Sequence, residues 1–178
     1  MRTVLKRMIV VFITVFVIIS FSVATRATED PVSCPRTLPD KIELPRDLER
    51  ILARVYRGSA TFRAQCDRIG AAGGTLAVNV RLDTGIPSSY QAFTMIGRRG
   101  HALRADVHLP PAAIAIAELV GHEFEHILEQ LDGLNLRMLS NVRGSGVRES
   151  SFDVYETTRA QRVGRIVAAE LSAPQTAD

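Results

Sequence analysis

The segment His122-Glu123-Phe124-Glu125-His126 contains two of the chain's four histidines, four positions apart, with a glutamate after the first. Apolar residues recur at helical spacing on both sides, and side chains four positions apart on a helix point the same way. His122 and His126 could therefore bind one zinc ion together. Glu123 lies one step round the helix, where its carboxylate could take a proton from a zinc-activated water. The motif makes a zinc-dependent hydrolase the first hypothesis.

A catalytic zinc site needs a third protein ligand, and Glu156 is the favoured candidate. It lies on a predicted C-terminal helix, on the stripe that also carries Ala160 and Val167. A carboxylate on an inward-facing stripe is costly to bury unless it is paired or bound to a metal. The small residues Ala160 and Gly164 would let this helix approach its partner closely. The alternative role of Glu156 is an ion pair with a neighbouring arginine such as Arg159.

Asp132 is the alternative third ligand. It lies six positions after His126, a spacing that resembles the metzincin pattern, in which this position supplies the third ligand. That pattern also has a glycine three positions after the second histidine, where this chain has Glu129, a good helix former. Without the bend, Asp132 would continue along the helix away from the metal. A role in orienting a ligand or ending the helix before Gly133 is favoured for it.

The periodicity of the chain predicts an α+β fold in which the motif lies on a long helix from residue 112. Two helices are expected before it, one after Pro45 and one with Ser59 as its N-cap. Alternating patterns then predict three strands, taken as an antiparallel sheet with one solvent-exposed face. A final helix is expected after a capping-box pattern at Ser150 and Asp153. The expected strands cover 76–82, 90–96 and 102–109, and the final helix covers 152–171.

The N-terminus has the pattern of an export signal. Basic residues precede a mostly apolar run over 8–24, and small residues follow it. Residues 1–27 are expected to be a cleaved signal peptide, with a membrane anchor through 8–24 as the alternative. The protein would then be periplasmic or secreted, or would be anchored with its domain outside the cytoplasm. We expect an extended Pro-containing arm over 28–44, a single domain over 45–171 and a tail over 172–178.

Charge and cysteine content narrow the function further. The N-terminal 27 residues hold four of the 22 basic residues and no acid, so the rest of the chain has 18 basic and 19 acidic residues and a net charge of −1. This balance gives no reason to expect nucleic-acid binding. Cys34 and Cys66 are the only cysteines. A disulfide between them is expected in an oxidising compartment, with two independent thiols as the alternative.

On His122, Glu123, His126 and Glu156 the chain resembles the gluzincin-type metallopeptidases, in a small form. The resemblance implies a zincin-like fold, a bound zinc and hydrolysis of a peptide or protein substrate. It also implies that an edge strand, taken as 102–109, holds extended peptide by backbone hydrogen bonds. The chain departs from the pattern at Glu125, where zinc peptidases usually avoid charge. It departs again at position 160, where larger members often carry an aspartate that orients a ligand.

The sequence therefore favours an exported zinc-dependent metallopeptidase with Glu123 as the general base. The alternative is a catalytically inactive zincin-like binding module, with or without a membrane anchor. The residue that stabilises the oxyanion is left open among several candidates, and the pattern indicates neither a substrate sequence nor an oligomeric state. These candidates are Tyr90, His101, His108, Tyr155 and several arginines.

Overall fold

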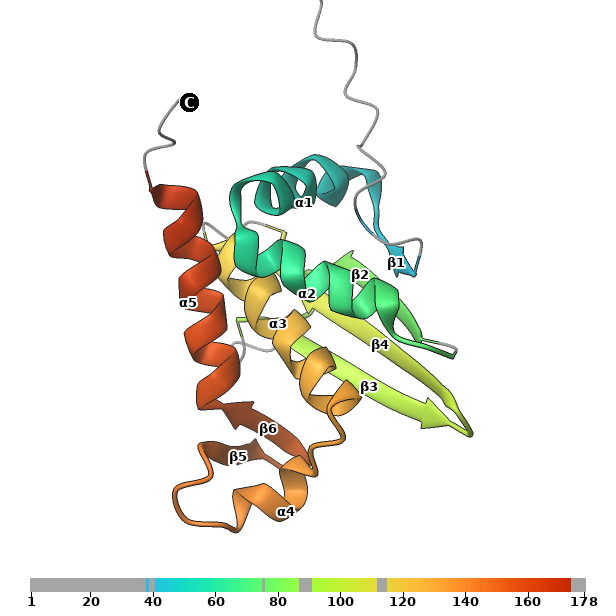
Figure 1. Ribbon diagram of the computed structural model, residues 1–178, viewed down its shortest axis with the longest axis vertical. Helices are drawn as coiled ribbons and strands as arrows, with labels where there is room; N and C mark the ends of the chain where they lie inside the picture. Colours follow the sequence, from blue (N-terminus) through green and yellow to red (C-terminus); the bar gives the residue numbers. More distant parts are fainter. Residues whose placement is uncertain (1–37, 39–40, 75, 87–90, 112–114, 174–178) are drawn as a thin grey trace, which may run out of the picture. The chain divides into compact units, whose positions relative to one another are not determined.

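A four-stranded sheet, a two-stranded hairpin and five helices make up the described part of the chain in a computed structural model (Figure 1). The structure describes residues 38, 41–74, 76–86, 91–111 and 115–173. The predicted α+β class is confirmed. The expected signal or anchor, including 8–24, lies outside the described residues. None of the helices in these described ranges has the length and apolar character needed to span a bilayer.

The first two helices form where the sequence predicts them. Helix α1 (Arg46–Gly58) follows Pro45 and buries Leu48 and Leu52. Helix α2 (Ala60–Ala71) begins after Ser59, whose side-chain oxygen accepts a hydrogen bond from the Phe62 amide at 2.9 Å. This bond satisfies one of the amides that a helix start leaves without a partner.

The main sheet is mixed, so the expectation of an antiparallel sheet is wrong. Its strands are β1 (Ile42–Glu43), β2 (Leu76–Leu82), β3 (Phe93–Arg99) and β4 (Ala102–Leu109), in the order β1-β2-β4-β3. Strands β1 and β4 each pair with β2 in parallel, and only β3 and β4 pair as an antiparallel hairpin. Alternation in the sequence reports which face of a strand is buried and carries no information on the direction of its neighbour.

The sheet also has four strands where three were expected. The additional strand β1 comes from the end of the expected extended arm, and two residues are too short to show alternation. The strand order corrects a second expectation. Strand β4 lies between β2 and β3, so its backbone is already paired on both sides. The edge strands of the described sheet are β1 and β3, and of these the seven-residue β3, rather than the segment 102–109, is long enough to pair with an extended chain.

The motif lies on helix α3 (Ile116–Leu131), as predicted. Its end is a Schellman motif: the Leu134 amide donates to the Glu129 carbonyl at 3.0 Å, and the Gly133 amide donates to the Gln130 carbonyl at 3.1 Å. Gly133 has the positive φ of 74° that this ending requires. The short helix α4 (Leu136–Ser140) begins after the turn that ends α3.

The C-terminal helix begins later than predicted. Strands β5 (Val147–Ser151) and β6 (Val154–Thr157) form a hairpin, and helix α5 (Thr158–Ser172) follows it directly. The N-cap is Thr157, which accepts a hydrogen bond from the Ala160 amide at 2.9 Å. Asp153, read as part of a capping box, instead lies in the hairpin turn with φ of 58°. Phe152, expected at the start of the helix, is 89% exposed.

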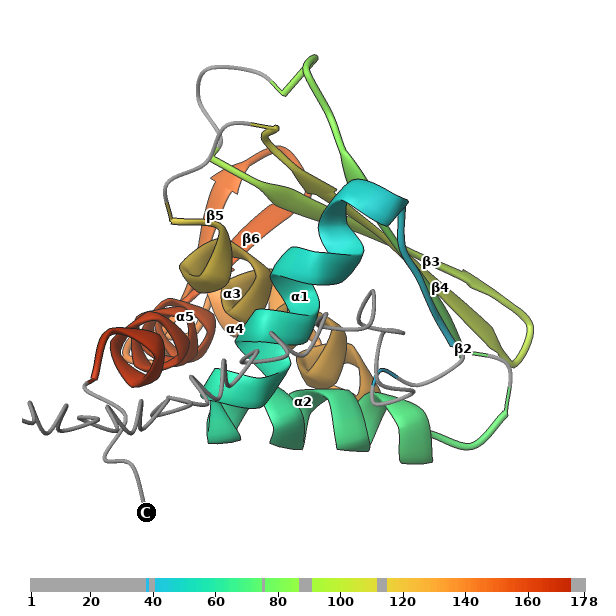
Figure 2. The same ribbon diagram turned by 90° about the horizontal axis from the view of Figure 1, so that it is seen from above.

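Helices α1, α2 and α3 cover one face of the main sheet, and α5 packs along α3 (Figures 1 and 2). The core between helices and sheet is apolar, and the Phe62 and Phe124 rings lie 5.1 Å apart within it. The strand alternation that predicts one solvent-exposed face is confirmed, because the other face of β2 and β4 carries Asn79, Arg104 and Asp106.

Candidate metal centre

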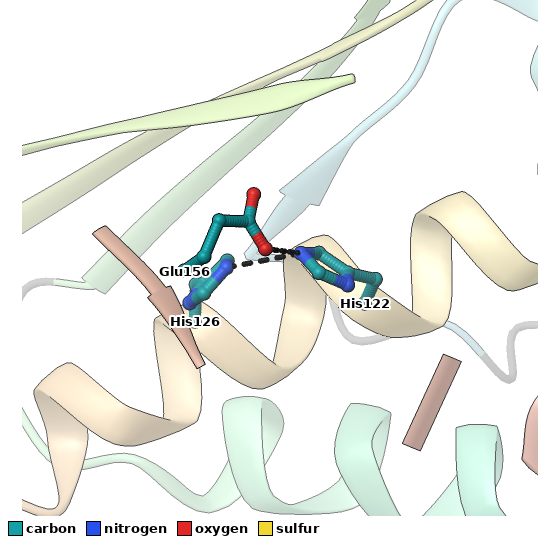
Figure 3. A group of neighbouring side chains, drawn as sticks. All are labelled: His122, His126 and Glu156. Atoms are coloured by element: carbon teal, nitrogen blue, oxygen red, sulfur yellow. Dashed lines mark hydrogen bonds and ion pairs between the residues drawn. The ribbon is translucent and has the colours of Figure 1, made fainter. Parts of the chain in front are cut away.

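Helix α3 brings the two motif histidines together. The Nε2 atoms of His122 and His126 lie 3.1 Å apart, on the side of the helix that faces β6 (Figure 3). Their rings meet edge to face, with centroids 4.8 Å apart. Both rings are largely buried, with 16% and 11% of their side-chain surfaces exposed. The helical spacing of the motif therefore produces the convergence that the sequence predicts.

Glu156 completes the group from a different element than expected. It lies on strand β6, one residue before the N-cap of α5, and its Oε2 atom is 3.5 Å from Nε2 of His122. One ligand atom from each of the three residues lies within 4.8 Å of the others. We call His122, His126 and Glu156 the ligand group. Glu156, the carboxylate that the sequence favours as third ligand, thus lies beside the histidines, but on a strand rather than on the helical stripe from which it was chosen.

The donor set and its dimensions suit a metal ion. Zinc binds histidine nitrogen and carboxylate oxygen at roughly 2.0–2.2 Å, so tetrahedral ligand atoms lie about 3.3 Å from one another. The separations of 3.1 Å and 3.5 Å measured from His122 Nε2 bracket that value. The ligand group could therefore hold a metal ion.

Glu129 fixes the orientation of His126. Its Oε2 atom lies 2.8 Å from Nδ1 of His126, and its Oε1 atom accepts a hydrogen bond from the Thr157 hydroxyl at 2.6 Å. The carboxylate is 1% exposed. A proton on Nδ1 leaves Nε2 free to bind a metal, an arrangement typical of histidine ligands. The sequence argument noted Glu129 only where a metzincin has glycine. Its spacing of three from His126 is the signal that could have found it.

Glu123 is almost completely buried from solvent beside the ligand group. It is 3% exposed, and its Oε2 atom accepts a hydrogen bond from the Thr94 hydroxyl at 2.7 Å. Burial raises the pKa of Glu123 to about 7. A carboxylate with a pKa near the working pH is suited to accept and return a proton.

The pKa values of the two histidines are shifted in opposite directions. Burial and the neighbouring His126 lower the pKa of His122. Burial also opposes protonation of His126, but the hydrogen bond with Glu129 and the charge of Glu123 outweigh it, so the pKa of His126 is raised. Within the described ranges, no lysine or arginine forms an ion pair with Glu123, Glu129 or Glu156. The centre is thus rich in electron-pair donors and poor in cationic side chains.

Asp132, the alternative ligand, is paired with arginines instead. It forms ion pairs with Arg68 and, at 2.9 Å, with Arg159. Partial burial opposes its ionisation, but the hydrogen bonds from Arg159 and Arg68 outweigh this effect and lower the pKa of Asp132. As expected without a bend at Glu129, it lies at the end of α3, where it is the C-cap. The structure brings Glu156, and not Asp132, to the histidines.

Glu125, which departs from the usual pattern of zinc peptidases, has its own partners. It is 4% exposed and accepts hydrogen bonds from Arg159 and, at 2.8 Å, from Gln65 of α2. We call Arg68, Asp132, Arg159, Glu125 and Gln65 the Arg159 cluster. Its charges are neutralised within the cluster, so Glu125 is a structural residue rather than part of the metal centre.

Close packing of α5 on α3 holds the two halves of the centre together. A Cβ atom at Gly164 would lie 2.6 Å from the Glu118 carbonyl oxygen and 3.1 Å from Cβ of His122. Ala160 is completely buried in the same interface. The sequence argument that small residues allow a close approach is confirmed.

Three candidates for oxyanion stabilisation within the described ranges, His101, His108 and Tyr155, lie elsewhere or have other partners. His108 is held by Asp83, at 2.6 Å, and by Arg81 on the other face of the sheet. The Tyr155 hydroxyl donates to Asp153 at 3.0 Å, and His101 lies in the exposed turn after β3. Tyr90 lies outside the described residues.

Of the two cysteines expected to form a disulfide, the structure describes Cys66 and not Cys34. Cys66 is a free, buried thiol in α2, and burial raises its pKa. Cys34 lies outside the described residues, so the pairing remains a prediction.

No protein-family model, curated protein or solved structure matches the chain. Fold and site together define an α+β protein with a partly buried His-His-Glu group that could hold a metal ion.

Proposed function

We propose that the protein is an exported zinc-dependent metallopeptidase. The observation that carries the proposal is the arrangement of the ligand group beside Glu123, a buried carboxylate whose pKa is raised to about 7. A site that only stabilises the fold has no need of such a base. The donor set of two imidazoles and one carboxylate is one that catalytic zinc uses, with a further position open to water.

The ligand group would hold the ion, and a bound zinc would lower the pKa of a water molecule and polarise the substrate carbonyl. Glu123 accepts a proton from the attacking water and returns it to the leaving amine as the C–N bond breaks. Thr94 donates a hydrogen bond to one oxygen of Glu123, which fixes that oxygen and leaves the other for the proton. Glu129 keeps Nε2 of His126 directed at the ion.

Strand β3 is the proposed binding edge for an extended peptide. It carries Thr94, so backbone hydrogen bonds along this edge would bring the peptide past Glu123. Export through residues 1–27, or anchoring through 8–24, remains part of the proposal. Mass spectrometry of the mature N-terminus distinguishes them, since an anchored protein retains the apolar run.

The test compares peptide hydrolysis by the zinc-loaded protein and by Glu123→Gln. The variant should retain zinc and lose activity by roughly 10²–10⁴-fold, because it keeps the shape of the side chain and loses its basicity. Glu118→Gln, which removes one charge from the same helix, is the matched control and should retain activity. Retained hydrolysis in Glu123→Gln would exclude Glu123 as the base. A zinc-loaded wild-type protein without hydrolytic activity would favour the inactive binding module.

A further inference from the structure

A cavity of about 360 Å³ lies at the C-terminal end of α3. The residues that line it come from three parts of the chain. One lies on the edge strand β3, one lies on β6, and the others lie between the end of α3 and α4. The polar lining side chains are Arg98, Gln130, Asn135, Arg137 and Tyr155.

The cavity lies further along α3 than the ligand group, toward the C-terminal end of the helix. Gln130 follows His126 by four positions, so it lies on the same side of the helix, about 6 Å further along the axis. Tyr155 directly precedes Glu156 on β6, so the two side chains point to opposite faces and the strand backbone, rather than a shared face, links them. Arg98 follows Thr94 by four positions on β3, so both side chains lie on the same face of that strand. Helix α3 and strand β6 therefore carry both cavity residues and members of the ligand group, and β3 carries both Arg98 and Thr94, the partner of Glu123.

The lining offers hydrogen-bond donors and positive charge. None of the described residues that line the cavity is acidic. Arg98 is exposed and has no ion pair or hydrogen bond within the described part of the chain. Arg137 pairs with Asp153 at 2.8 Å through one of its nitrogens, which leaves further N–H groups. Asn135 uses its side-chain oxygen to cap α4, which leaves its amide N–H groups.

We infer that this cavity binds an acidic side chain, aspartate or glutamate, of a peptide that pairs with β3. The inference rests on the proposed function, because it takes a peptide along the edge strand as the ligand. A peptide paired with β3 past Thr94 would direct alternate side chains to the face on which Arg98 lies. A carboxylate can accept from two guanidinium groups and an amide at once, which a neutral amide side chain cannot match. The preference should be moderate, because Arg98 is exposed to solvent.

The test measures binding and does not depend on hydrolysis. The full-length, zinc-loaded Glu123→Gln protein is titrated with pools of short blocked peptides, random except for one internal position fixed as glutamate or glutamine, each position in turn. At one position the glutamate pool should bind at least about fivefold more tightly. Adding Arg98→Gln should reduce this ratio to near one, with zinc content unchanged. Arg99→Gln is the matched control, because Arg99 lies on the opposite face of β3 and should keep the preference.

Two outcomes would overturn the inference. One is equal binding of the glutamate and glutamine pools at every position, including no measurable binding of either. The other is a glutamate preference that survives the combined Arg98→Gln and Arg137→Gln changes. Cleavage is scored separately with the wild-type protein. Absence of cleavage counts against the peptidase proposal, while a glutamate preference that depends on Arg98 would still support the anionic cavity.

Discussion

Two sets of buried charge on α3 are balanced in different ways. In the Arg159 cluster, each carboxylate has a guanidinium partner, and the remaining oxygen of Glu125 accepts from the Gln65 amide. Around the ligand group, three glutamates and two histidines lie close together, and the further side-chain donors to them among the described residues are the hydroxyls of Thr94 and Thr157.

The difference separates a structural role from a functional one. Buried carboxylates are stable when a cationic side chain neutralises them, which is how the Arg159 cluster ties α3 to α5. The carboxylates near the ligand group lack such a partner in the described ranges, and a divalent cation would supply the balancing charge. Glu123 and Glu125 are only two positions apart, yet Glu123 lies beside the ligand group and Glu125 belongs to the Arg159 cluster.

The largest expected effect comes from removing a member of the ligand group. The wild-type protein should bind about one zinc per chain, His126→Ala should abolish binding, and Glu156→Gln should weaken it by at least about 100-fold. Asp132→Asn changes a carboxylate of the Arg159 cluster and should retain zinc. Elemental analysis after chelator competition measures this. Loss of zinc from Asp132→Asn alone would exchange the assignments of the two carboxylates.

Breaking the Arg159 cluster should destabilise the fold and spare the metal. Arg159→Leu leaves Glu125 buried without its cation and should lower the free energy of unfolding by about 3 kcal/mol, the low end for such pairs because Arg159 is 35% exposed. Urea unfolding measures the change. The double variant Glu125→Leu/Arg159→Leu should recover part of the loss. If the double variant is no more stable than Arg159→Leu, lost packing rather than the unpaired charge causes the destabilisation.

Removing the charge of Glu123 should stabilise the metal-free protein, whereas breaking the Arg159 cluster should destabilise it. Its pKa is raised from the usual 4.5 to about 7, so the folded state favours the neutral acid. Its protonation therefore stabilises the fold below pH 4.5, and this contribution is lost as the pH rises through 7. At pH 8, with a chelator present, Glu123→Gln should be more stable than wild type by about 2–3 kcal/mol. A gain that is equally large at pH 4 would contradict this explanation.

The smallest effect is expected from Glu129, which acts through His126. Glu129→Gln should lower zinc affinity by roughly 10- to 100-fold, because the amide holds the Nδ1 proton less strongly. Competition with a chromophoric chelator measures the affinity, and the unfolding of the metal-free protein serves as a second readout. Thr157→Ser keeps the hydroxyl and should retain wild-type affinity. An unchanged affinity in Glu129→Gln would leave Glu129 as a packing residue only.

Local signals in the sequence predict the elements better than their arrangement. The positions of α1, α2 and α3 follow from helical periodicity and from Ser59 and Gly133, which act within one turn. Strands β2 and β4 pair although β3 lies between them in the sequence. The residue pattern of neither strand indicates that the other is its partner. For the same reason the two-residue strand β1 could not be anticipated.

The metal centre was predictable in part. His122 and His126 are related by one helical turn, so their convergence follows from the sequence. Glu156 was selected as a carboxylate on an apolar helical stripe, but it lies on β6, so its position beside His122 depends on a hairpin that the sequence did not predict. The roles of Glu125 and Glu129 depend on what α2, α5 and Thr157 bring to them, and this information exists only in the folded chain.

The close packing at Gly164 has a consequence for how the ligand group could be lost during evolution. Because β6 leads directly into α5, any residue larger than glycine at this position would push the start of α5, and Glu156 with it, away from His122. A descendant could then keep all three ligand residues and still fail to bind the ion. An intact His-Glu-x-x-His motif with a downstream glutamate is therefore not enough to infer activity in a relative, and the residue opposite the first histidine has to be read with it.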